Sequence, residues 1–153
     1  MTEPITIEQL ALAQASELAA LHQQCFSDGM WSLEQLSDSL KLTSTLGFAS
    51  MLQGKITGFI LLQLMQDEAE ILTFCVHPLY QRQKIGEQLL QYVISTIKES
   101  DLFLEVACDN APACNLYGKL GFELMGRRPN YYRRSNGLVD ALLFRRPRFA
   151  SVG

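Results

Sequence analysis

The segment from Ala69 to Ile97 restricts the fold of this chain more than any other part of the sequence. Its first part, Ala69 to Val76, is a short apolar run that ends shortly before Pro78. After a polar loop, apolar residues recur at the spacing of one helix face: Ile85, Leu89, Leu90, Val93, Ile94 and Ile97. The segment therefore predicts a strand, a loop and a helix in this order.

The predicted loop carries residues that suit a phosphate group. It contains Arg82 and Lys84, and Gly86 lies where the helix is expected to begin. The first turn of a helix offers unpaired backbone N–H groups and the positive end of the helix dipole. Neither a P-loop, GxxxxGK(S/T), nor a GxGxxG dinucleotide motif is present. The loop either binds the pyrophosphate of a nucleotide-like cofactor or is an ordinary strand–helix connection.

Length and composition indicate one domain, spanning residues 1–153. The chain has 48% hydrophobic residues, enough for a sizeable core. No apolar run approaches the ~20 residues that a membrane-spanning helix needs, and the N-terminus lacks the layout of a signal peptide. We therefore expect a cytoplasmic protein with no membrane association.

Cysteine and histidine spacing gives no sign of a metal site. Cys25, Cys75, Cys108 and Cys114 form no CxxC pair and no zinc-type pattern, and their neighbours are mostly apolar. Reduced, packed thiols are expected. The two histidines lie far apart in the sequence. We therefore expect no bound metal.

Charge is distributed unevenly along the chain. Residues 1–123 hold fifteen acidic residues against six Lys or Arg, whereas residues 124–153 hold seven Arg against Asp140. The arginine-rich C-terminal segment could contact RNA, a ribosome or an acidic peptide weakly. The alternative is a solvated rim, which we favour.

Further strands and helices follow from local patterns. Ile5 to Leu10 is a candidate strand, residues 14–26 are a candidate helix, and Ser32 with Gln35 forms a capping box for a second helix. Three apolar runs, residues 45–52, 56–64 and 69–76, predict an antiparallel meander. Residues 85–98 and 111–120 are expected helices, and residues 102–107, 122–126 and 138–144 are expected strands.

The strand of residues 69–76, the helix after it and the strand of residues 102–107 form a β–α–β unit. Its crossover should be right-handed and its two strands parallel. We therefore predict an α/β fold with a mixed sheet, antiparallel in its first part, parallel in the middle, and covered by helices.

Glu105 lies in an otherwise apolar strand. Alternation places Phe103, Glu105 and Ala107 on one face of this strand. A carboxylate beside Phe103 is partly desolvated, which makes it a better base near neutral pH. The alternatives are a solvent-facing carboxylate or one paired with an arginine.

Asn110 and Tyr117 follow this strand. Asn110 lies near the start of the next helix, where capping alone would explain it. Tyr117 lies two turns into that helix and could direct its phenol at whatever the preceding strand end binds. The alternative for Tyr117 is a core side chain.

Two motifs in this chain resemble those of the GNAT N-acetyltransferases. The first, Val76-x-Pro-x-Tyr-Gln-Arg-Gln-x-Ile-Gly-x-x-Leu-Leu, is similar to the acetyl-CoA-binding motif of that family. The second, Asn110-x-x-Ala-x-x-x-Tyr117-x-x-Leu-Gly-Phe122, is similar to its later signature. The segments Phe103–Val106, Arg127–Tyr132 and Asp140-Ala141, with Trp31-Ser32, resemble one subfamily, the bacterial ribosomal-protein-alanine N-acetyltransferases of the RimI type.

The resemblance implies a fold and a cosubstrate site. It implies a GNAT-like sheet whose two central parallel strands splay apart and hold the acetyl-pantetheine arm of acetyl-CoA, with no metal. The implied cofactor-binding residues are Phe74, Cys75, Val76, Arg82, Gln83, Lys84, Ile85, Gly86, Glu87 and Asn110. The family pattern has a glycine where this chain has Lys84, so Lys84 is expected to avoid positive φ.

The resemblance also implies a reaction. Acetyl-CoA would donate its acetyl group directly to the N-terminal amine of a protein, most simply the N-terminal alanine of a ribosomal protein. Glu105 would remove the proton of the amine through water, and Tyr117 would protonate the departing thiolate. Tyr131 and Tyr132 suggest a slot for a protein N-terminus.

Other functions stay open on the sequence alone. The acceptor could be a lysine side chain, a polyamine or another small amine. A covalent route through Cys108 or Cys114 has no histidine nearby in the sequence. A non-catalytic CoA-sensing or ribosome-docking module is the remaining alternative, although such a module needs neither Glu105 nor Tyr117.

Overall fold

The computed structural model describes residues 5–26, 31–81 and 83–148. Its elements, in chain order, are β1 (Thr6–Gln9), the 3-10 turn η1 (Leu12–Gln14), α1 (Ala15–Cys25), α2 (Leu33–Lys41), β2 (Thr45–Leu52), β3 (Lys55–Leu64), β4 (Glu68–Val76), the 3-10 turn η2 (Pro78–Tyr80), α3 (Ile85–Thr96), β5 (Asp101–Ala107), α4 (Ala111–Lys119), β6 (Glu123–Arg134) and β7 (Gly137–Arg146). Among the described residues, no helix is long and apolar enough to cross a membrane.

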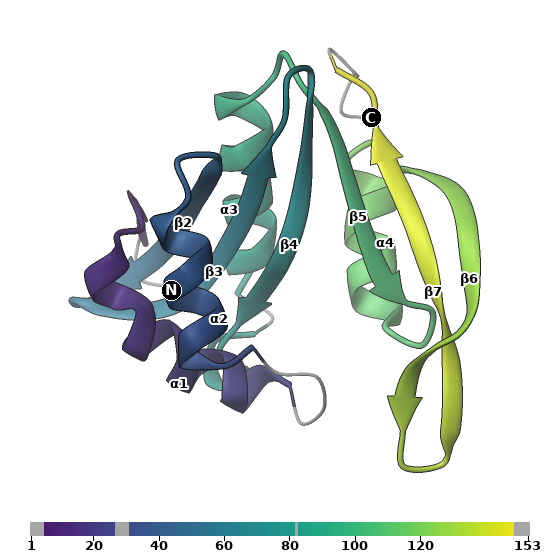
Figure 1. The fold of residues 1–153 in the computed structure, drawn as a ribbon, viewed down its shortest axis with the longest axis horizontal. Coiled ribbons are helices and arrows are strands. Elements are labelled where there is room, and N and C mark those ends of the chain that lie inside the picture. Colours follow the sequence, from purple (N-terminus) through teal and green to yellow (C-terminus); the bar gives the residue numbers. More distant parts are fainter. Residues whose placement is uncertain (1–4, 27–30, 82, 149–153) are drawn as a thin grey trace.

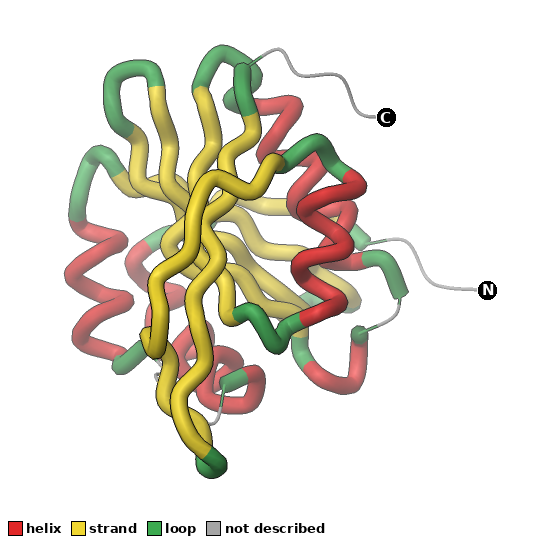
Figure 2. The backbone as a smooth tube through the Cα atoms, turned by 90° about the vertical axis from the view of Figure 1, so that its right-hand side faces the viewer, coloured by secondary structure: helices red, strands yellow, loops and turns green. Residues whose placement is uncertain are grey.

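The strands form one mixed sheet in the order β1-β2-β3-β4-β5-β7-β6. Among the strands that the structure describes, only β4 and β5 pair in parallel, and α3 connects them, so the predicted β–α–β unit and mixed α/β sheet are confirmed. Figure 1 shows α1 and α2 in front of the sheet and α3 and α4 behind it. Figure 2, turned by 90°, shows the β6–β7 hairpin extending beyond the rest of the sheet.

The two central parallel strands separate soon after they begin. They pair only through Glu68 with Asp101, Ala69 with Leu102, and Glu70 with Phe103. Beyond these pairs β4 and β5 diverge towards their C-terminal ends (Figure 1). The implied splay of the central strands is therefore present.

A bulge in β4 accompanies this separation. Leu61 of β3 pairs with Thr73 and Leu62 pairs with Ile71, so Leu72 is the extra residue on β4. A bulge interrupts the alternation of side chains and increases the local twist. Accordingly, Ile71 and Phe74 are three residues apart and yet both pack on the α3 side of the sheet, whereas Leu72 between them packs on the α1 side.

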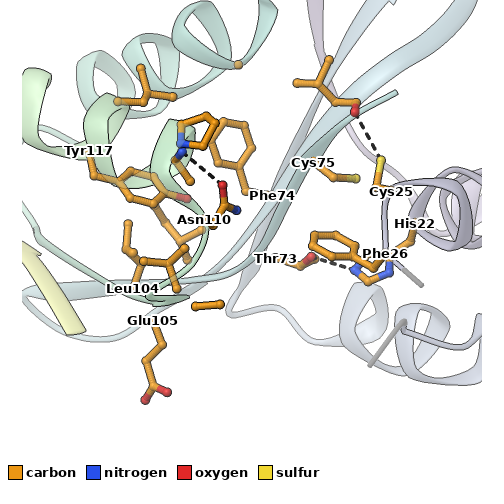
Figure 3. Close-up of a pocket in the computed structure, with 18 of the residues that line it drawn as sticks. His22, Cys25, Phe26, Thr73, Phe74, Cys75, Leu104, Glu105, Asn110 and Tyr117 are labelled. Atoms are coloured by element: carbon orange, nitrogen blue, oxygen red, sulfur yellow. Dashed lines mark hydrogen bonds between the residues drawn. The ribbon is translucent and has the colours of Figure 1, made fainter. Parts of the chain in front are cut away.

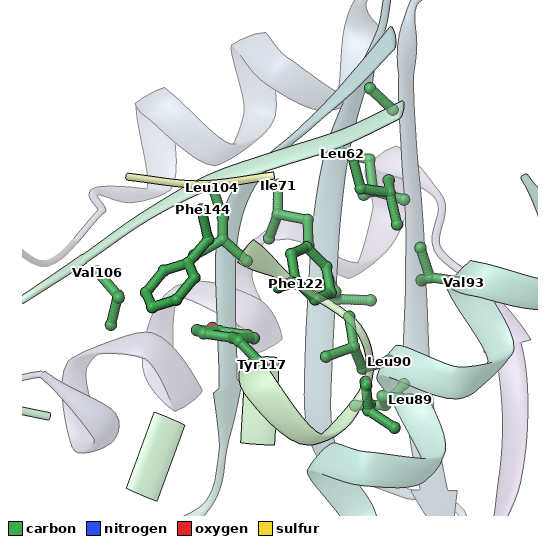
Figure 4. Close-up of a cluster of buried hydrophobic side chains, with 14 of the residues drawn as sticks. Leu62, Ile71, Leu89, Leu90, Val93, Leu104, Val106, Tyr117, Phe122 and Phe144 are labelled. Carbon is green, nitrogen blue, oxygen red and sulfur yellow. The ribbon is translucent and has the colours of Figure 1, made fainter. Parts of the chain in front are cut away.

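Each face of the sheet has its own apolar core. The larger cluster joins α3 and α4 to the sheet and includes Leu89, Leu90, Leu104, Tyr117 and Phe144 (Figure 4). The smaller cluster joins α1 and α2 to the first half of the sheet, around Leu18, Leu36 and Phe59. The helices α1 and α2 thus cover β2 to β4, whereas none of the described helices lies over the same face of β5 to β7 (Figure 1).

Local signals fix several element ends as expected. Ser32 Oγ accepts from the Gln35 N–H at 3.1 Å and the Gln35 side chain accepts from the Ser32 N–H at 2.8 Å, which completes the capping box. Gln53 and Gly54 connect β2 and β3 with φ of 51° and 79°, as in a type I′ hairpin turn. Gly121 follows α4 with φ of 94°, the usual role of glycine after a helix.

The last two strands are longer than the sequence predicts. Residues 122–126 and 138–144 were expected, but β6 continues to Arg134 and β7 to Arg146. Pro129 interrupts the pattern of β6, yet β6 is an edge strand, where proline is tolerated. A register shift accommodates it, and the Asn130 N–H there donates to Asp140 Oδ1 at 2.9 Å.

Most arginines of the C-terminal segment have partners within the chain. Ion pairs join Arg127 to Asp140, Arg128 to Glu105, Arg134 to Asp109, Arg145 to Asp101, and Arg148 to Asp101 and Asp67. The buried Arg146 donates to the Leu120 carbonyl oxygen at 2.8 Å. The segment is therefore largely neutralised within the fold, which does not support the RNA contact considered from the sequence.

Asp101, the first residue of β5, binds two arginines of this segment, Arg145 and Arg148. Its carboxylate accepts from the Arg148 backbone N–H at 2.8 Å and from Arg145 Nη2 at 2.9 Å. These two hydrogen bonds lower the pKa of Asp101 from 3.8 to about 2. Because the folded-state pKa is depressed, the stabilisation is present above about pH 4 and is lost as pH falls towards 2.

We predict that Asp101→Asn lowers the free energy of unfolding at pH 7 by roughly 1–2 kcal/mol, since charge-assisted hydrogen bonds weaken. Urea unfolding of both proteins at pH 7 and near pH 2 measures the effect. The difference should shrink at the lower pH. Asp38→Asn is the matched control, because its ion pair with Lys41 is exposed and 4.0 Å long. A constant difference at both pH values would contradict the assignment.

Candidate active site

A cavity of about 520 Å³ lies where β4 and β5 separate. It is lined from both central strands, from α1 and from α4 (Figure 3), and also from the far part of β6. Seven of the twelve residues that the resemblance assigns to catalysis or cofactor binding line it: Phe74, Cys75, Val76, Gly86, Glu105, Asn110 and Tyr117. The structure therefore gathers both proposed catalytic residues and one end of the proposed cofactor site around one space.

The peptide group of Val76 faces the gap. The N–H of the next residue, His77, donates in the other direction, to the Thr57 carbonyl oxygen at 2.8 Å. In a strand, the N–H and carbonyl groups of one residue point to one edge, and those of the next residue point to the other edge. The N–H and carbonyl groups of Val76 therefore point towards β5. The Val76 carbonyl oxygen accepts there from Gln81 Nε2 at 3.1 Å and from Cys25 Sγ at 3.3 Å. The Val76 N–H is thus a donor available to a ligand in the gap.

The start of α3 lies directly against this strand end. A Cβ added to Gly86 would meet Phe74 Cζ at 3.4 Å and Val76 Cγ2 at 3.6 Å. Ile85 is buried and anchors the first turn in the core. The N-terminal turn of α3 therefore lies within van der Waals reach of the strand end that lines the cavity, and a Cβ at position 86 would make only ordinary contacts there.

The other named residues of this turn lie outside the cavity lining. Gln83 and Lys84 are exposed, and the Glu87 carboxylate forms an ion pair with Lys119 of α4. Arg82 lies outside the described residues. The turn and the gap together could hold an extended ligand whose phosphate end meets the start of α3.

The expectation for Lys84 is wrong. Lys84 has φ of 62° and ψ of 19°, the left-handed conformation that was expected to be avoided. This conformation is strained for a residue with a Cβ, by roughly 1–2 kcal/mol. Lys84 is the N-cap of α3, and its carbonyl oxygen accepts from the Gln88 N–H at 3.0 Å. The loop therefore adopts the left-handed backbone conformation that a glycine at this position would favour, although a lysine does not favour it.

Tyr117 is both a core residue and a cavity residue. Its ring lies 5.5 Å from that of Phe122 and 6.0 Å from that of Phe144, and the residue is 6% exposed. In Figure 3 its phenol points to the side of Asn110 and Phe74. Burial raises the pKa of Tyr117, so the phenol keeps its proton at neutral pH and is available as a donor.

Asn110 caps α4, as the alternative explanation of this residue predicts. Its Oδ1 accepts from the Ala113 N–H at 3.3 Å. Asn110 also lines the cavity and is exposed. Capping orients the side chain, and the amide group remains accessible to a ligand.

Glu105 has an arginine partner, which was one alternative from the sequence. Arg128 Nε lies 3.1 Å from Glu105 Oε1, and the side chains are 55% and 25% exposed respectively. Figure 3 shows the Glu105 carboxylate pointing away from Tyr117. Leu104 and Val106, its neighbours in β5, pack on the α4 side, so Glu105 faces the opposite side of the sheet.

The sequence did not predict that α1 forms one wall of the cavity. The His22 Nδ1 accepts from the Trp31 backbone N–H at 3.1 Å, so the proton lies on Nε2, which donates to Thr73 Oγ1 at 2.9 Å. Burial lowers the pKa of His22 to about 4, so the ring is neutral near pH 7. These three residues line the cavity. Trp31 was noticed in a motif, but only the fold brings it to His22.

The far part of β6 also lines the cavity, through Tyr132 and Arg134. The resemblance had placed Tyr132 in a slot for a protein N-terminus, whereas Arg134 had been given no site role. The Arg134 guanidinium pairs with Asp109 at 3.1 Å and lies over the Tyr132 ring at 5.6 Å from its centroid. Burial, with Glu105 nearby, raises the pKa of Tyr132. The described residues contain no group of three or more His, Cys, Asp or Glu residues that could hold a metal ion.

Comparison with known families identifies one family model. The model of the acetyltransferase (GNAT) family matches residues 15–122. A ribosomal protein bS18-alanine N-acetyltransferase of Escherichia coli is 37% identical over 105 residues, which cover 67% of this chain and 71% of that protein. An N-alpha-acetyltransferase RimI of Mycobacterium tuberculosis is 32% identical over 150 residues, covering 95% of this chain and 94% of the relative.

Solved structures agree with these relatives. The crystal structure of the ribosomal-protein-S18-alanine N-acetyltransferase from Escherichia coli matches with a TM-score of 0.91 and 30% identity, covering 98% of this chain and 97% of that chain. A plant structure, Arabidopsis thaliana NAA60 in complex with acetyl-CoA, has a TM-score of 0.78 at 19% identity over 93% of this chain and 97% of that chain, which supports the fold alone.

Proposed function

The chain belongs to the acetyltransferase (GNAT) family, and we propose that it transfers the acetyl group of acetyl-CoA to the N-terminal amine of a ribosomal protein that begins with alanine. One observation carries the proposal: 98% of the chain aligns with a solved ribosomal-protein-alanine N-acetyltransferase at a TM-score of 0.91. The direction of the Val76 peptide group, into the gap between β4 and β5, supports it. This acceptor places the reaction in the cytoplasm.

In the proposed complex, acetyl-CoA extends from the start of α3 into the gap. Its diphosphate binds the backbone N–H groups at the start of α3, from Gln83 to Glu87, where the helix dipole is positive. The pantetheine arm pairs with the free edge of β4 at Phe74 to Val76. Three observations support this placement: the free edge of β4, the close packing of Gly86 on Phe74, and Asn110 on the cavity wall.

The choice of an N-terminal amine has a thermodynamic reason. An α-ammonium group has a pKa near ~8, against ~10.4 for a lysine side chain, so its deprotonation costs roughly 3 kcal/mol less near neutral pH. Glu105 takes this proton, directly or through one water molecule, and leaves a neutral amine with a free electron pair. A carboxylate can do this for an α-amine more readily than for lysine.

The transfer then forms one bond and breaks another. The amine nitrogen attacks the thioester carbonyl carbon, and the Val76 N–H donates to the oxygen as negative charge develops on it. The C–S bond breaks, and Tyr117 donates its proton to the CoA thiolate. The new amide nitrogen loses its surplus proton, which passes through solvent to restore the Tyr117 phenol. Because Tyr117 stays protonated when free, it can act as the acid.

The two proposed proton-transfer residues lie on opposite faces of the sheet. Glu105 faces the open side of β5 to β7, and Tyr117 faces the α4 side (Figure 3). The acceptor can therefore enter on the Glu105 side while the thiolate leaves on the Tyr117 side. Arg128 is more than half exposed, so its guanidinium can move away from Glu105 at a small free-energy cost.

We predict that Glu105→Gln and Tyr117→Phe each lower kcat by roughly 10²–10⁴-fold, the usual contribution of a general base or acid. Acetyl-CoA affinity should change little, because neither side chain holds the proposed diphosphate or pantetheine contacts. Steady-state kinetics and calorimetric titration with acetyl-CoA measure the two quantities. Near-wild-type kcat in either variant would remove that residue from the mechanism.

Arg128→Gln is the matched control for Glu105→Gln. Both variants lose the ion pair between these residues, but only Glu105→Gln loses the carboxylate. If the ion pair itself supports turnover, the two variants will lose activity to the same extent. The proposal requires that Arg128→Gln retain most of kcat.

The acceptor is tested by following thiol release from acetyl-CoA with a panel of amines. We expect the highest kcat/KM with a peptide that carries the alanine-starting N-terminus of ribosomal protein bS18, and no turnover when that N-terminus is blocked. Peptides beginning with Ser or Met, free lysine and a polyamine are the comparison. Faster turnover of lysine or the polyamine would reassign the acceptor. Tight acetyl-CoA binding without turnover on any amine would favour the non-catalytic alternative.

A further inference from the structure

Two cysteines meet in the cavity although the proposed transfer uses neither thiol. Cys25 is the last residue of α1, and Cys75 is the next-to-last residue of β4. Both line the cavity, and Figure 3 shows their thiols directed towards each other. Both are free cysteines in this structure. They lie fifty residues apart in sequence, so only the packing of α1 on the sheet brings them together.

The two thiols lie side by side at the end of β4. Cys25 Sγ donates to the Val76 carbonyl oxygen at 3.3 Å, and the Cys75 thiol lies beside Cys25 Sγ (Figure 3), where it can donate a hydrogen bond to that sulfur. The hydrogen bond from Cys75 lowers the pKa of Cys25, whereas the same bond and burial raise the pKa of Cys75. Cys25 is therefore the better nucleophile of the pair, and Cys75 stays a neutral thiol beside it.

The exposure of the two thiols also indicates that Cys25 is oxidised first. Cys25 is partly exposed, whereas Cys75 is 7% exposed. A partly exposed thiol with a second thiol next to it is the arrangement in which a first oxidation is resolved as a disulfide. The other cysteine pair differs, because burial raises the pKa of Cys114 and neither Cys108 nor Cys114 lines the cavity.

We propose that Cys25 and Cys75 form a redox-modification site whose oxidant is a peroxide. In the first step the Cys25 sulfur attacks one peroxide oxygen, the O–O bond breaks, and Cys25 becomes a sulfenic acid. With hydrogen peroxide the other oxygen leaves as water. In the second step Cys75 attacks the Cys25 sulfur, the S–O bond breaks, and a disulfide and a second water form. Two thiols are oxidised by two electrons, and one peroxide is reduced.

The disulfide changes the surroundings of the Val76 backbone groups, which the proposed transfer needs. It removes the Cys25 hydrogen bond to the Val76 carbonyl oxygen and ties the end of α1 to β4 beside the same peptide group. This shifts the strand end that would bind the pantetheine arm. Weaker acetyl-CoA binding in the oxidised protein rests on the proposed function, whereas formation of the disulfide does not.

The cross-link is detected without any activity measurement. Trypsin releases Cys25 in the peptide of residues 1–41, Cys75 in that of residues 56–82, and Cys108 with Cys114 in that of residues 99–119. After brief treatment of the full chain with hydrogen peroxide, mass spectrometry under non-reducing conditions should show peptides 1–41 and 56–82 joined with the loss of two hydrogen atoms. Dithiothreitol should separate them.

Variants assign the effect to this pair. Cys25→Ser keeps a donor for the Val76 carbonyl oxygen but cannot form the disulfide, and a Cys108→Ala/Cys114→Ala protein keeps the pair. For each, acetyl-CoA affinity is compared before and after peroxide, so any change in starting affinity cancels. We expect affinity to fall about tenfold, the size of one or two lost hydrogen bonds, in the double variant and not in Cys25→Ser.

Three results would overturn the proposal. One is cross-linking of peptide 99–119 in place of peptide 56–82. Another is oxidation of Cys25 to sulfinic acid with no cross-link. The third is equal peroxide sensitivity in Cys25→Ser. A cross-link in a protein that does not bind acetyl-CoA at all would instead support the site and contradict the proposed function.

Discussion

The early end of the pairing between β4 and β5 is the constraint on which the site depends. Two parallel strands normally satisfy each other's backbone groups along their length. Here pairing stops after Glu70 and Phe103, and the bulge at Leu72 turns the rest of β4 away. The peptide groups of the strand end, including the Val76 N–H, therefore lack a strand partner on the β5 side. They face a cavity in which a ligand can satisfy them.

The two halves of the molecule hold this gap open for different reasons. On one side, α1 and α2 pack on β2 to β4 around Leu18, Leu36 and Phe59. On the other, α4 packs beneath β5 and β7 through Tyr117, Phe122 and Phe144. Ion pairs then join the β6–β7 hairpin to β5 and its following loop, at Glu105 and Asp109. The arginine-rich segment thus shapes one cavity wall.

The sequence predicted the elements well because most of them carry local signals. The apolar spacing of α3, the capping box at Ser32 and the turn at Gln53-Gly54 each act within a few residues. The full extent of β6 was not predictable, because it depends on pairing with β7 and on Asp140 holding the bulge at Asn130. The left-handed Lys84 was mispredicted, because the loop and helix around it override its own preference.

The site was predictable only in part. Glu105, Asn110 and Tyr117 could be named from motif spacing, and their gathering around one cavity follows from the β–α–β crossover. The contact of His22 with Thr73, and that of Cys25 with Val76, each join residues 51 positions apart. No local pattern encodes such contacts.

The most direct test of this account is an NMR titration that follows backbone amide signals as ligand is added. With CoA, the amides of Val76, Gly86 and Glu87 should shift, while that of Gly54 in the distant β2–β3 turn should not. Pantetheine, which lacks the diphosphate, should shift Val76 and leave Gly86 and Glu87 in place. If CoA leaves Val76 unchanged, the gap between β4 and β5 does not hold the pantetheine arm, and the account is contradicted.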